Sequence, residues 1–427
     1  MLLNKHIDKA YHAVQSHADD SRVILLHPQS KYRSVLVAQL ISNQDTPAFY
    51  YALGPDDISL RAFIEGFTHD MANQHPTFGR HLNLLPARVY ADMTGHMDDV
   101  LDYFVRELEE VSDEMFYLVL DEYDRSDEAD DIHRFVEKLA DVMPEHCRLV
   151  LNSRTLPRLP WISMVAKQQA ALLLDDELIE DDFYGIKHTG TIDLAIYALG
   201  PGFVDFQGER IEAWEGHLPR LLFFFALDKP VVTRSEICTA FWPELPIDQA
   251  VNVFHVTKRR LHKALGMDVL VHTNSHYRVN PEFNIYYDVL DFVETLMRGR
   301  NPDTQNPFEV YQHAVKLYRG PFLQGHSEDW IAERKSAFRE GYLEAMSAMA
   351  QMWIGKDRKE LALKLYRQAL EEYYYRDDIH REIMTLYEEL GRRSEAVAHY
   401  KDMKRVYRDS DVEIEPATAQ MYSDISV

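Results

Sequence analysis

The stretch VNVFHVTKRRLHKALG, residues 251–266, separates apolar from basic side chains at the spacing of an α-helix. At about 100° per residue its apolar residues share one side, which predicts a helix half-buried against a core. We expect Asp248 to cap its start and Gly266 to follow its end. The apolar side holds Ala250, Val253, Phe254, Thr257, Leu261, Ala264 and Leu265, and the opposite side holds Asn252, His255, Arg259, His262 and Lys263, with Lys258 and Arg260 at its edges.

The basic side of this predicted helix contrasts with the charge of the whole chain. The 427 residues carry a formal net charge of -24 at pH 7, yet residues 251–266 contain no Asp or Glu. A helix in so acidic a chain usually mixes charges of both signs when it needs only to be soluble. A solvated helix surface is the alternative interpretation. Cations without carboxylates favour an anionic partner, and DNA is the first candidate.

Two more helices and a hairpin are predicted around this stretch. LPRLLFFFALDKP, residues 218–230, is apolar enough for a core helix, and TRSE, residues 233–236, is a capping box that starts another. VLVHTNSHYRV, residues 269–279, reads as two short strands around a polar turn. Three helices followed by a hairpin predict a winged helix-turn-helix, whose third helix enters a DNA major groove about 12 Å wide.

The N-terminal part of the chain alternates strand and helix signals. Short apolar runs lie at RVILLH (22–27), PAFYYAL (47–53), FYLVLDEYD (116–124) and CRLVLNSRT (147–155), and helical patterns such as DIHRFVEKLADVM (131–143) lie between them. Apolar runs that end in polar residues are typical of buried parallel strands. We therefore expect an α/β layer with a parallel sheet in the first ~185 residues.

The C-terminal part is helical and weakly repetitive. ELALKLYRQ (360–368) and SEAVAHYKD (394–402) align at an offset of 34 residues, which is the period of tetratricopeptide repeats. NPDTQNP, at residues 301–307, is the clearest linker. The predicted fold is thus multidomain α/β plus α, with an α/β module at residues 1–188, a winged helix at 189–297 and a helical-repeat domain at 305–427.

Composition limits the class of protein. No apolar run approaches the roughly 18 residues that a membrane-spanning helix needs, and the N-terminus lacks the apolar core of a secretion signal. Cys147 and Cys238 are far apart, each in an apolar setting, which indicates unpaired thiols in a reducing compartment. We expect a cytoplasmic protein that does not bind membranes.

The residues from 191 to 425 resemble SARP transcriptional activators. YALGPGFVDFQGERI (197–211), TRSEICTAFWPE (233–244) and VHTNSHYRVNPE (271–282) look like the OmpR-type winged helix of that family, together with the stretch that opens this section. VYQHAVKLYRGPFLQG (310–325), DWIAERKSAFREGYLEAM (329–346) and EIEPATAQMYSDI (413–425) look like its bacterial transcriptional activation domain, BTAD. The resemblance implies promoter binding, usually at direct repeats, and recruitment of RNA polymerase.

The resemblance also implies roles for individual residues. Asn252, His255, Arg259 and His262 are candidates to read bases, while Lys258, Arg260 and Lys263 would contact phosphates. The family often has Gln in place of His255 and Arg in place of His262, so the preferred bases are open. Thr233 and Arg234 lie at a helix N-terminus, which favours a phosphate. The residues that match the wing are Asn274, Ser275, His276 and Arg278.

Residues 20–155 resemble the nucleotide-binding core of STAND-type ATPases, with one part missing. A working phosphate loop follows the pattern GxxxxGK[ST], in which glycine N–H groups wrap the phosphates. Here His27 and Tyr32 stand at the glycine positions, Arg33 replaces Lys, and only Ser34 matches. Asp121 and Glu122 retain the acidic pair of the Walker B strand. We interpret the module as a degenerate P-loop NTPase fold that binds no cofactor and has a regulatory or dimerising role.

The predicted function is sequence-specific DNA binding by a non-enzymatic transcription regulator, and the family resemblance implies an activator. Its expected partners are double-stranded promoter DNA, RNA polymerase and a second copy of the chain. Two alternatives stay open: an ATP-driven switch that uses Asp121 and Glu122, and a protein–protein scaffold without DNA binding. No metal is expected, because His272 and His276 lie too far apart on a hairpin and the acidic run at 120–131 lacks the order of an EF-hand.

Overall fold

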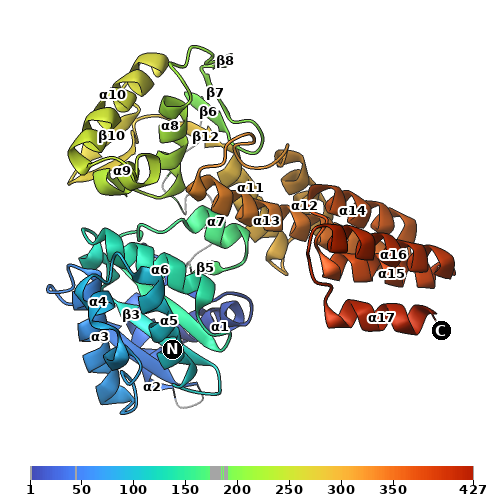
Figure 1. The fold of residues 1–427 in the computed structure, drawn as a ribbon, viewed down its shortest axis with the longest axis horizontal. Coiled ribbons are helices and arrows are strands. Elements are labelled where there is room, and N and C mark those ends of the chain that lie inside the picture. The colour runs from blue at the N-terminus through green and yellow to red at the C-terminus, as the bar shows by residue number, and fades with distance from the viewer. Residues whose placement is uncertain (1, 44–45, 174–183, 185, 187–190, 427) are drawn as a thin grey trace. The chain divides into compact units, whose positions relative to one another are not determined.

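The structure is a computed structural model that describes residues 2–43, 46–173, 184, 186 and 191–426. The chain divides into two compact units (Figure 1). The first unit comprises Met1–Ile196 and Phe203–Tyr286, and the second comprises Tyr197–Gly202 and Tyr287–Val427. Below, residues 2–173 are called the sheet domain and residues 203–286 the helix–hairpin region; both lie in the first unit.

The sheet domain is built on five strands in the order β2-β3-β4-β1-β5, and each strand is parallel to its neighbours. This confirms the predicted parallel sheet. The four apolar runs became strands, while a fifth strand formed from Ala170–Leu173, where the sequence gives no clear strand signal. The strands are β1 (Val23–Leu26), β2 (Ala48–Ala52), β3 (Phe116–Asp121), β4 (Cys147–Asn152) and β5 (Ala170–Leu173).

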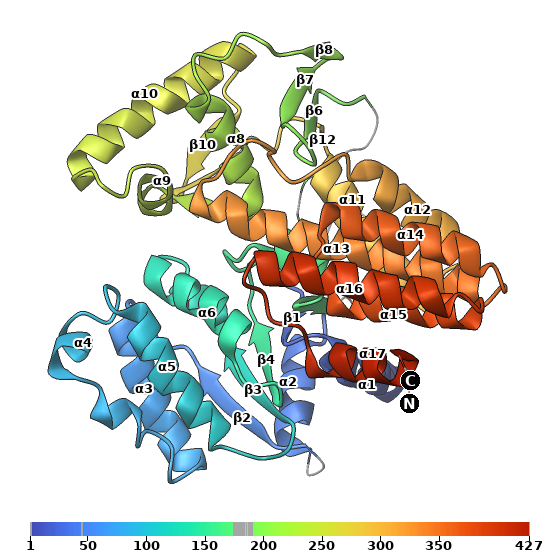
Figure 2. The same cartoon turned by 45° about the vertical axis from the view of Figure 1, so that its right-hand side comes forward.

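Helices cover both faces of this sheet, so the strands are buried on two sides. On one face, Tyr11 and Val14 of α1 and Leu36 of α2 pack with strand residues such as Ile24 and Val150. The other face is covered by α3, α5 and α6 (Figure 2), which a cluster of aromatic rings joins to one another. The helices are α1 (Leu2–Asp20), α2 (Arg33–Ser42), α3 (Leu60–Gln74), α4 (Ala87–Ala91), α5 (Met97–Glu109), α6 (Asp130–Val142) and α7 (Trp161–Ala166), with short 3-10 turns at Leu82–Leu84 and Tyr123–Ser126.

The helix–hairpin region contains three helices and parts of two small sheets. A four-stranded sheet has the order β12-β6-β7-β8, and a three-stranded sheet has the order β10-β11-β9. Helix α8 is almost entirely buried, as its run of Leu and Phe requires. The elements of the region, with β6 just before it and β12 ending one residue after it, are β6 (Leu194–Tyr197), β7 (Phe203–Phe206), β8 (Glu209–Arg210), α8 (Leu218–Asp228), β9 (Val232–Thr233), α9 (Arg234–Phe241), α10 (Ile247–Leu265), β10 (Leu270–Thr273), β11 (His276–Val279) and β12 (Ile285–Tyr287).

Helix α10 forms where the opening stretch predicts it. Phe254 and Leu261 are fully buried, and Gly266 ends the helix in the left-handed conformation with φ +69°. The prediction that Asp248 caps the helix was wrong. Pro246 takes the N-cap position, because its φ of -53° already suits a helix start, and Asp248 lies inside the first turn.

The second unit is helical apart from a short segment that it takes from upstream. Residues Ala198 and Leu199 donate their backbone N–H groups to the buried carboxylate of Asp288, at 2.7 and 3.2 Å. Arg319 also donates to that carboxylate. The helices are α11 (Asp288–Arg300), α12 (Pro307–Leu317), α13 (Asp329–Ile354), α14 (Lys359–Glu372), α15 (Asp377–Glu389), α16 (Arg393–Asp409) and α17 (Pro416–Ser426).

The two stretches of the 34-residue period occupy equivalent places in this unit. The first lies in α14 and the second in α16, and both Ala362 and Ala396 are fully buried at the aligned position. Tyr366 and Tyr400 are buried at the next aligned position. No helix among the described residues is long and apolar enough to cross a membrane.

Candidate nucleic-acid interface

The outward side of α10 carries most of the residues that the sequence assigns to DNA. Asn252, His255, Arg259, Arg260 and Lys263 are exposed, while the apolar side of the helix packs inward. From residue 252 to 263 the helix has no acidic residue. An exposed helix side with Asn, His and Arg presents both donors for base edges and charges for phosphates.

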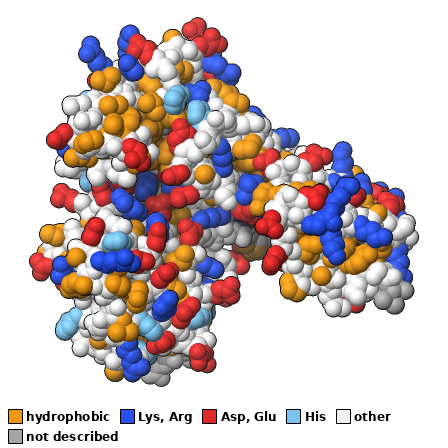
Figure 3. Space-filling model, viewed as in Figure 1, with side chains coloured by type: hydrophobic (Ala, Val, Ile, Leu, Met, Phe, Trp, Pro, Cys, Tyr) orange, Lys and Arg blue, Asp and Glu red, His pale blue; other side chains and the backbone are white. Residues whose placement is uncertain are grey.

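One carboxylate from outside the helix reaches this side. Glu215, in the loop before α8, forms an ion pair with Arg260 at 3.5 Å and accepts a hydrogen bond from Lys263. In Figure 3, Asp and Glu side chains stand beside Lys and Arg at the upper end of the region where α10 lies in Figure 1. The hydrogen bond from Lys263 lowers the pKa of Glu215. Exposed ion pairs of this kind are weak.

His262 does not belong to the exposed side, which corrects its predicted role as a base reader. Its Nδ1 lies 2.6 Å from the Asp268 carboxylate, and its Nε2 accepts the backbone N–H of Leu270 at 3.3 Å. The side chain is 16% exposed, and burial lowers its pKa. A neutral ring with both nitrogens engaged ties the end of α10 to the start of β10.

Lys258 is held beside the hairpin. Its ammonium lies 5.2 Å from the centre of the Tyr277 ring, a cation–π distance. Tyr277 in turn packs edge-on against Phe254 at 5.0 Å and is buried. Lys258 is therefore partly buried and points from α10 toward the wing.

The hairpin presents its tip to solvent. Strands β10 and β11 are joined by Asn274 and Ser275, whose φ values are +50° and +67°. Two successive positive φ values match a type I′ turn, which suits the twist of a tight hairpin. Asn274, Ser275 and Arg278 are exposed, whereas His276 is partly buried.

Two other predicted DNA residues contact the sheet domain instead of solvent. Thr233 caps α9 in a complete capping box with Glu236, and its hydroxyl donates to the Asp130 carboxylate at 2.7 Å. The Nε2 atom of His276 lies 3.1 Å from the backbone oxygen of Asp127. Arg234, next to Thr233, is exposed. The capping box is confirmed, but the place proposed for a phosphate already faces a carboxylate.

The Walker B-like residues Asp121 and Glu122, at the carboxyl end of β3, form hydrogen bonds and an ion pair with neighbouring residues. The Asp121 carboxylate accepts hydrogen bonds from Tyr50 at 2.9 Å, Asn152 at 2.7 Å and the Glu122 backbone at 2.7 Å. Burial and the bond to Asp121 raise the pKa of Tyr50 to about 12. Glu122 takes a left-handed conformation and pairs with Arg125. The carboxylates therefore have structural partners here.

In the loop where a phosphate would bind, an arginine side chain forms hydrogen bonds with the backbone of the loop itself. Arg33 opens α2, and its guanidinium donates to the carbonyl oxygens of His27 and Pro28. His27 and Ser30 are buried within this loop, and Tyr32 stands just before the helix. Ser34 follows in the first turn. In a functional loop, backbone N–H groups would face this space and bind phosphate oxygens.

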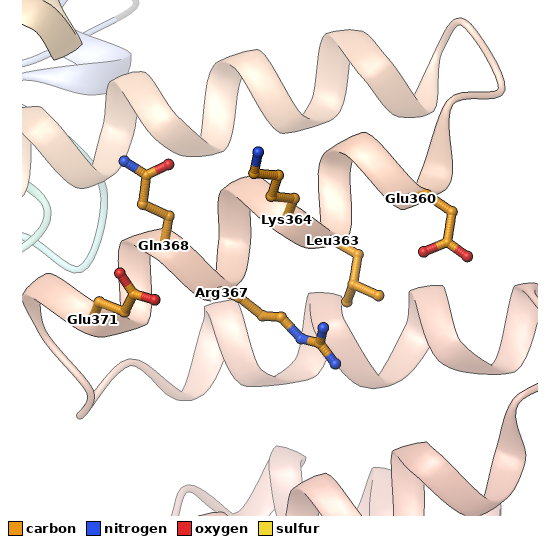
Figure 4. Close-up of a pocket in the computed structure, with 6 residues that line it drawn as sticks. All are labelled: Glu360, Leu363, Lys364, Arg367, Gln368 and Glu371. Carbon is orange, nitrogen blue, oxygen red and sulfur yellow. The ribbon is translucent and has the colours of Figure 1, made fainter.

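A shallow groove of about 450 Å³ lies along α14 in the second unit (Figure 4). Its lining mixes two acidic and two basic side chains with one amide and one leucine, so its charge favours no class of ligand. The lining residues are Glu360, Leu363, Lys364, Arg367, Gln368 and Glu371. Among the described residues, no group of three or more His, Cys, Asp or Glu side chains could hold a metal ion.

Sequence reasoning missed three residues that shape this interface. Glu215 neutralises part of α10, and Asp130 and Arg158 connect the sheet domain to α9. No local pattern identifies them, because each partner lies far away in the sequence. Arg158 sits between prolines in LPRLP, which reads only as a loop.

Comparison with known proteins bears on the second unit. Residues 288–426 match the family described as "Bacterial transcriptional activator domain". Among solved structures, the chain is similar to Mycobacterium tuberculosis EmbR in complex with a low affinity phosphopeptide, at 20% identity and a TM-score of 0.45. That similarity covers 55% of this chain and 65% of the EmbR chain, which is slightly less than two thirds. No curated protein matches the sequence.

Proposed function

Given that residues 288–426 are a bacterial transcriptional activator domain, which supports a transcriptional activator of the SARP type, we propose that this chain binds promoter DNA in a sequence-specific way. Helices α8, α9 and α10 with the β10–β11 hairpin act as a winged helix-turn-helix. Helix α10 enters the major groove, the hairpin approaches the adjacent backbone, and the C-terminal helices contact RNA polymerase.

The observation that carries this proposal is the two-sided character of α10. Its buried side, with Phe254 and Leu261, anchors the helix against the core, while Asn252, His255 and Arg259 face solvent. A recognition helix needs both properties, because side chains can read bases only when the helix axis is held rigidly. The absence of Asp and Glu from residues 252–263 removes the repulsion that phosphates would otherwise meet.

The exposed residues divide into two groups by chemistry. Asn252, His255 and Arg259 can form hydrogen bonds with base edges, and Arg prefers guanine. Lys258, Arg260 and Lys263, with Arg234 and Arg278, would contact the sugar–phosphate backbone and set the position of the helix. The exposed amide and hydroxyl of the hairpin tip, Asn274 and Ser275, add contacts to the neighbouring backbone.

Binding to direct repeats would place two copies of the chain side by side on DNA, so we include a second copy among the partners. A regulator of this kind acts in the bacterial cytoplasm, where promoters are. No catalytic step is part of the proposal, since Asp121 and Arg33 are engaged by their own neighbours.

The experiment that tests this proposal is selection from a pool of random DNA duplexes with the full-length protein. We expect an enriched repeat, and we expect a variant with Arg259→Ala and Lys263→Ala to lose that enrichment. The matched control is Arg405→Ala with Lys401→Ala, which removes the same charge from the exposed side of α16. Binding that depends on salt but selects no sequence would contradict the proposal.

A further inference from the structure

The sheet domain and the helix–hairpin region meet at a cluster of charged side chains. Arg158 lies at its centre and its side chain is only 1% exposed. One of its nitrogens donates to Glu236 at 2.7 Å, and the other lies 3.0 Å from Asp130. Asp130 is the first residue of α6, and Glu236 belongs to the first turn of α9. Arg158 therefore links the starts of these two helices.

A second cation completes the cluster. The Lys229 ammonium lies 3.0 Å from Glu137 of α6 and 3.3 Å from Glu236 of α9. All three side chains are less than a fifth exposed. Below, the name clamp denotes Asp130, Glu137 and Arg158 of the sheet domain together with Lys229, Thr233 and Glu236 of the helix–hairpin region.

The clamp and one contact of the hairpin beside it occupy two places that a winged helix presents to DNA. The Thr233 hydroxyl, at the N-terminus of α9, donates to Asp130 at 2.7 Å, which is the contact that a DNA phosphate would make there. On the hairpin, His276 lies 3.1 Å from the Asp127 carbonyl oxygen. Asp130 thus stands where the proposed function requires an anion from DNA.

The charge of the clamp also opposes DNA. Asp130, Glu137 and Glu236 bring three carboxylates, and Arg158 and Lys229 bring two cations, so one negative charge is in excess. Burial pushes the pKa of Glu236 upward, but Lys229 and Arg158 outweigh it and hold that pKa below its ordinary value. The Glu236 carboxylate therefore stays ionised at neutral pH and keeps its electrostatic attraction to Lys229 and Arg158.

We propose that the sheet domain inhibits DNA binding by clamping the start of α9 and the hairpin, with Asp130 in the position of a DNA phosphate. This inference rests on the proposed function. Opening the clamp frees Thr233 and His276 for DNA, whereas the exposed side of α10 is accessible in both states. The sheet domain acts as a competitor that a signal must displace, and it needs no nucleotide to do so.

The test compares DNA affinity of full-length variants, with a 25-base-pair duplex of the selected sequence and a scrambled duplex as probes. We expect Asp130→Asn to tighten binding of the selected duplex about tenfold, because the competing charge at Thr233 is lost. The matched control is Asp98→Asn, which removes the same charge from the exposed pair with Lys138 inside the sheet domain. Equal affinities for wild type, D130N and D98N would overturn the proposal.

Hydrogen exchange at the backbone amides of residues 231–237 gives a readout that does not depend on DNA. We expect faster exchange there in D130N than in D98N, since α9 loses its partner. Glu137→Gln serves as a second variant in case D130N folds poorly, and the same changes are expected. If wild type and both clamp variants fail to bind any duplex, the proposed function itself fails. If wild type binds as tightly as the variants, only the clamp fails.

Discussion

The exposed side of α10 and the edge of the parallel sheet at Asp121 both place charged residues at positions typical of a functional site. They differ in what surrounds those charges. Arg259 and Asn252 project from an anchored helix into solvent. Asp121 accepts three hydrogen bonds from Tyr50, Asn152 and the following backbone N–H group.

Residue type alone therefore does not identify a site. A carboxylate whose lone pairs are occupied by neighbouring donors stabilises the fold and has little capacity left for a ligand. A cation on a helix surface keeps its capacity, because water is its main competitor. Four variants test this contrast, beginning with the one expected to change binding most.

The largest effect is expected from Arg259→Ala on α10. Removing a base-reading side chain costs about 1–3 kcal/mol of binding free energy and relaxes one position of the site. Lys263→Ala, in contrast, should weaken all duplexes alike and reduce the salt dependence by about one ion. Fluorescence anisotropy with the selected duplex and its single-base variants distinguishes the two. Uniform weakening by both variants would remove Arg259 from base reading.

The next effect concerns the sheet edge. Asp121→Asn replaces one of the two carboxylate oxygens by an amide donor, so either Tyr50 or Asn152 loses its acceptor, and we expect a loss of about 2 kcal/mol in the free energy of unfolding. DNA affinity should stay within twofold of wild type. Urea unfolding followed by circular dichroism measures the loss, and Asp56→Asn on an exposed turn is the control. A rise in melting temperature on adding Mg·ATP to wild type would contradict a structural role.

A smaller effect is expected from pH at His262. Burial lowers the folded-state pKa of this residue below 6.5, so its contribution to stability is present above 6.5 and is lost as the pH falls through the folded value. His262→Gln should remove that part of the pH dependence and cost about 1 kcal/mol at pH 7.5, because the bond to Leu270 weakens. Melting temperatures of wild type and of the His262→Gln variant at pH 5.5 and 7.5 measure this difference in pH dependence. A variant as pH-dependent as wild type would leave His262 without this role.

The smallest effect is expected at Glu215. Glu215→Gln frees Lys263 and Arg260 from their ion pairs, which contribute little because both partners are exposed to solvent. We therefore expect roughly a twofold gain in DNA affinity at low salt that disappears at high salt. Glu212→Gln, an exposed carboxylate in the same loop, provides the matched control. The same gain in both variants would indicate a general charge effect.

Local patterns predicted the elements of α10 and of the sheet well. The burial of Phe254 and Leu261 could be predicted, because helical periodicity alone indicates which side of a helix faces the core. Strand β5 was not predicted, although it has the same length as β1, because two of its four residues are Ala, which is depleted in strands. The match of residues 288–426 to an activator domain agrees with the resemblance found in the sequence.

Long-range partners could not be predicted from the sequence. In the sequence, His262 falls on the basic side of the helix. In the structure, its two ring nitrogens contact Asp268 and the backbone of Leu270. Asp130 and Thr233 are about a hundred residues apart, and neither motif indicates the other. Such contacts depend on how elements pack, and periodicity within one element holds no information about that.

The segment Tyr197–Gly202 belongs to the second unit, and this has a consequence for synthesis of the chain. Leu199 forms a β-bridge with Phe322, and Arg319 donates to the Leu199 carbonyl oxygen across 120 residues. The segment leaves the ribosome long before its partners are synthesised. The second unit therefore cannot form its contacts with this segment until about residue 323 has emerged. A gene fragment that begins at residue 288 encodes a unit whose Asp288 carboxylate lacks both backbone donors.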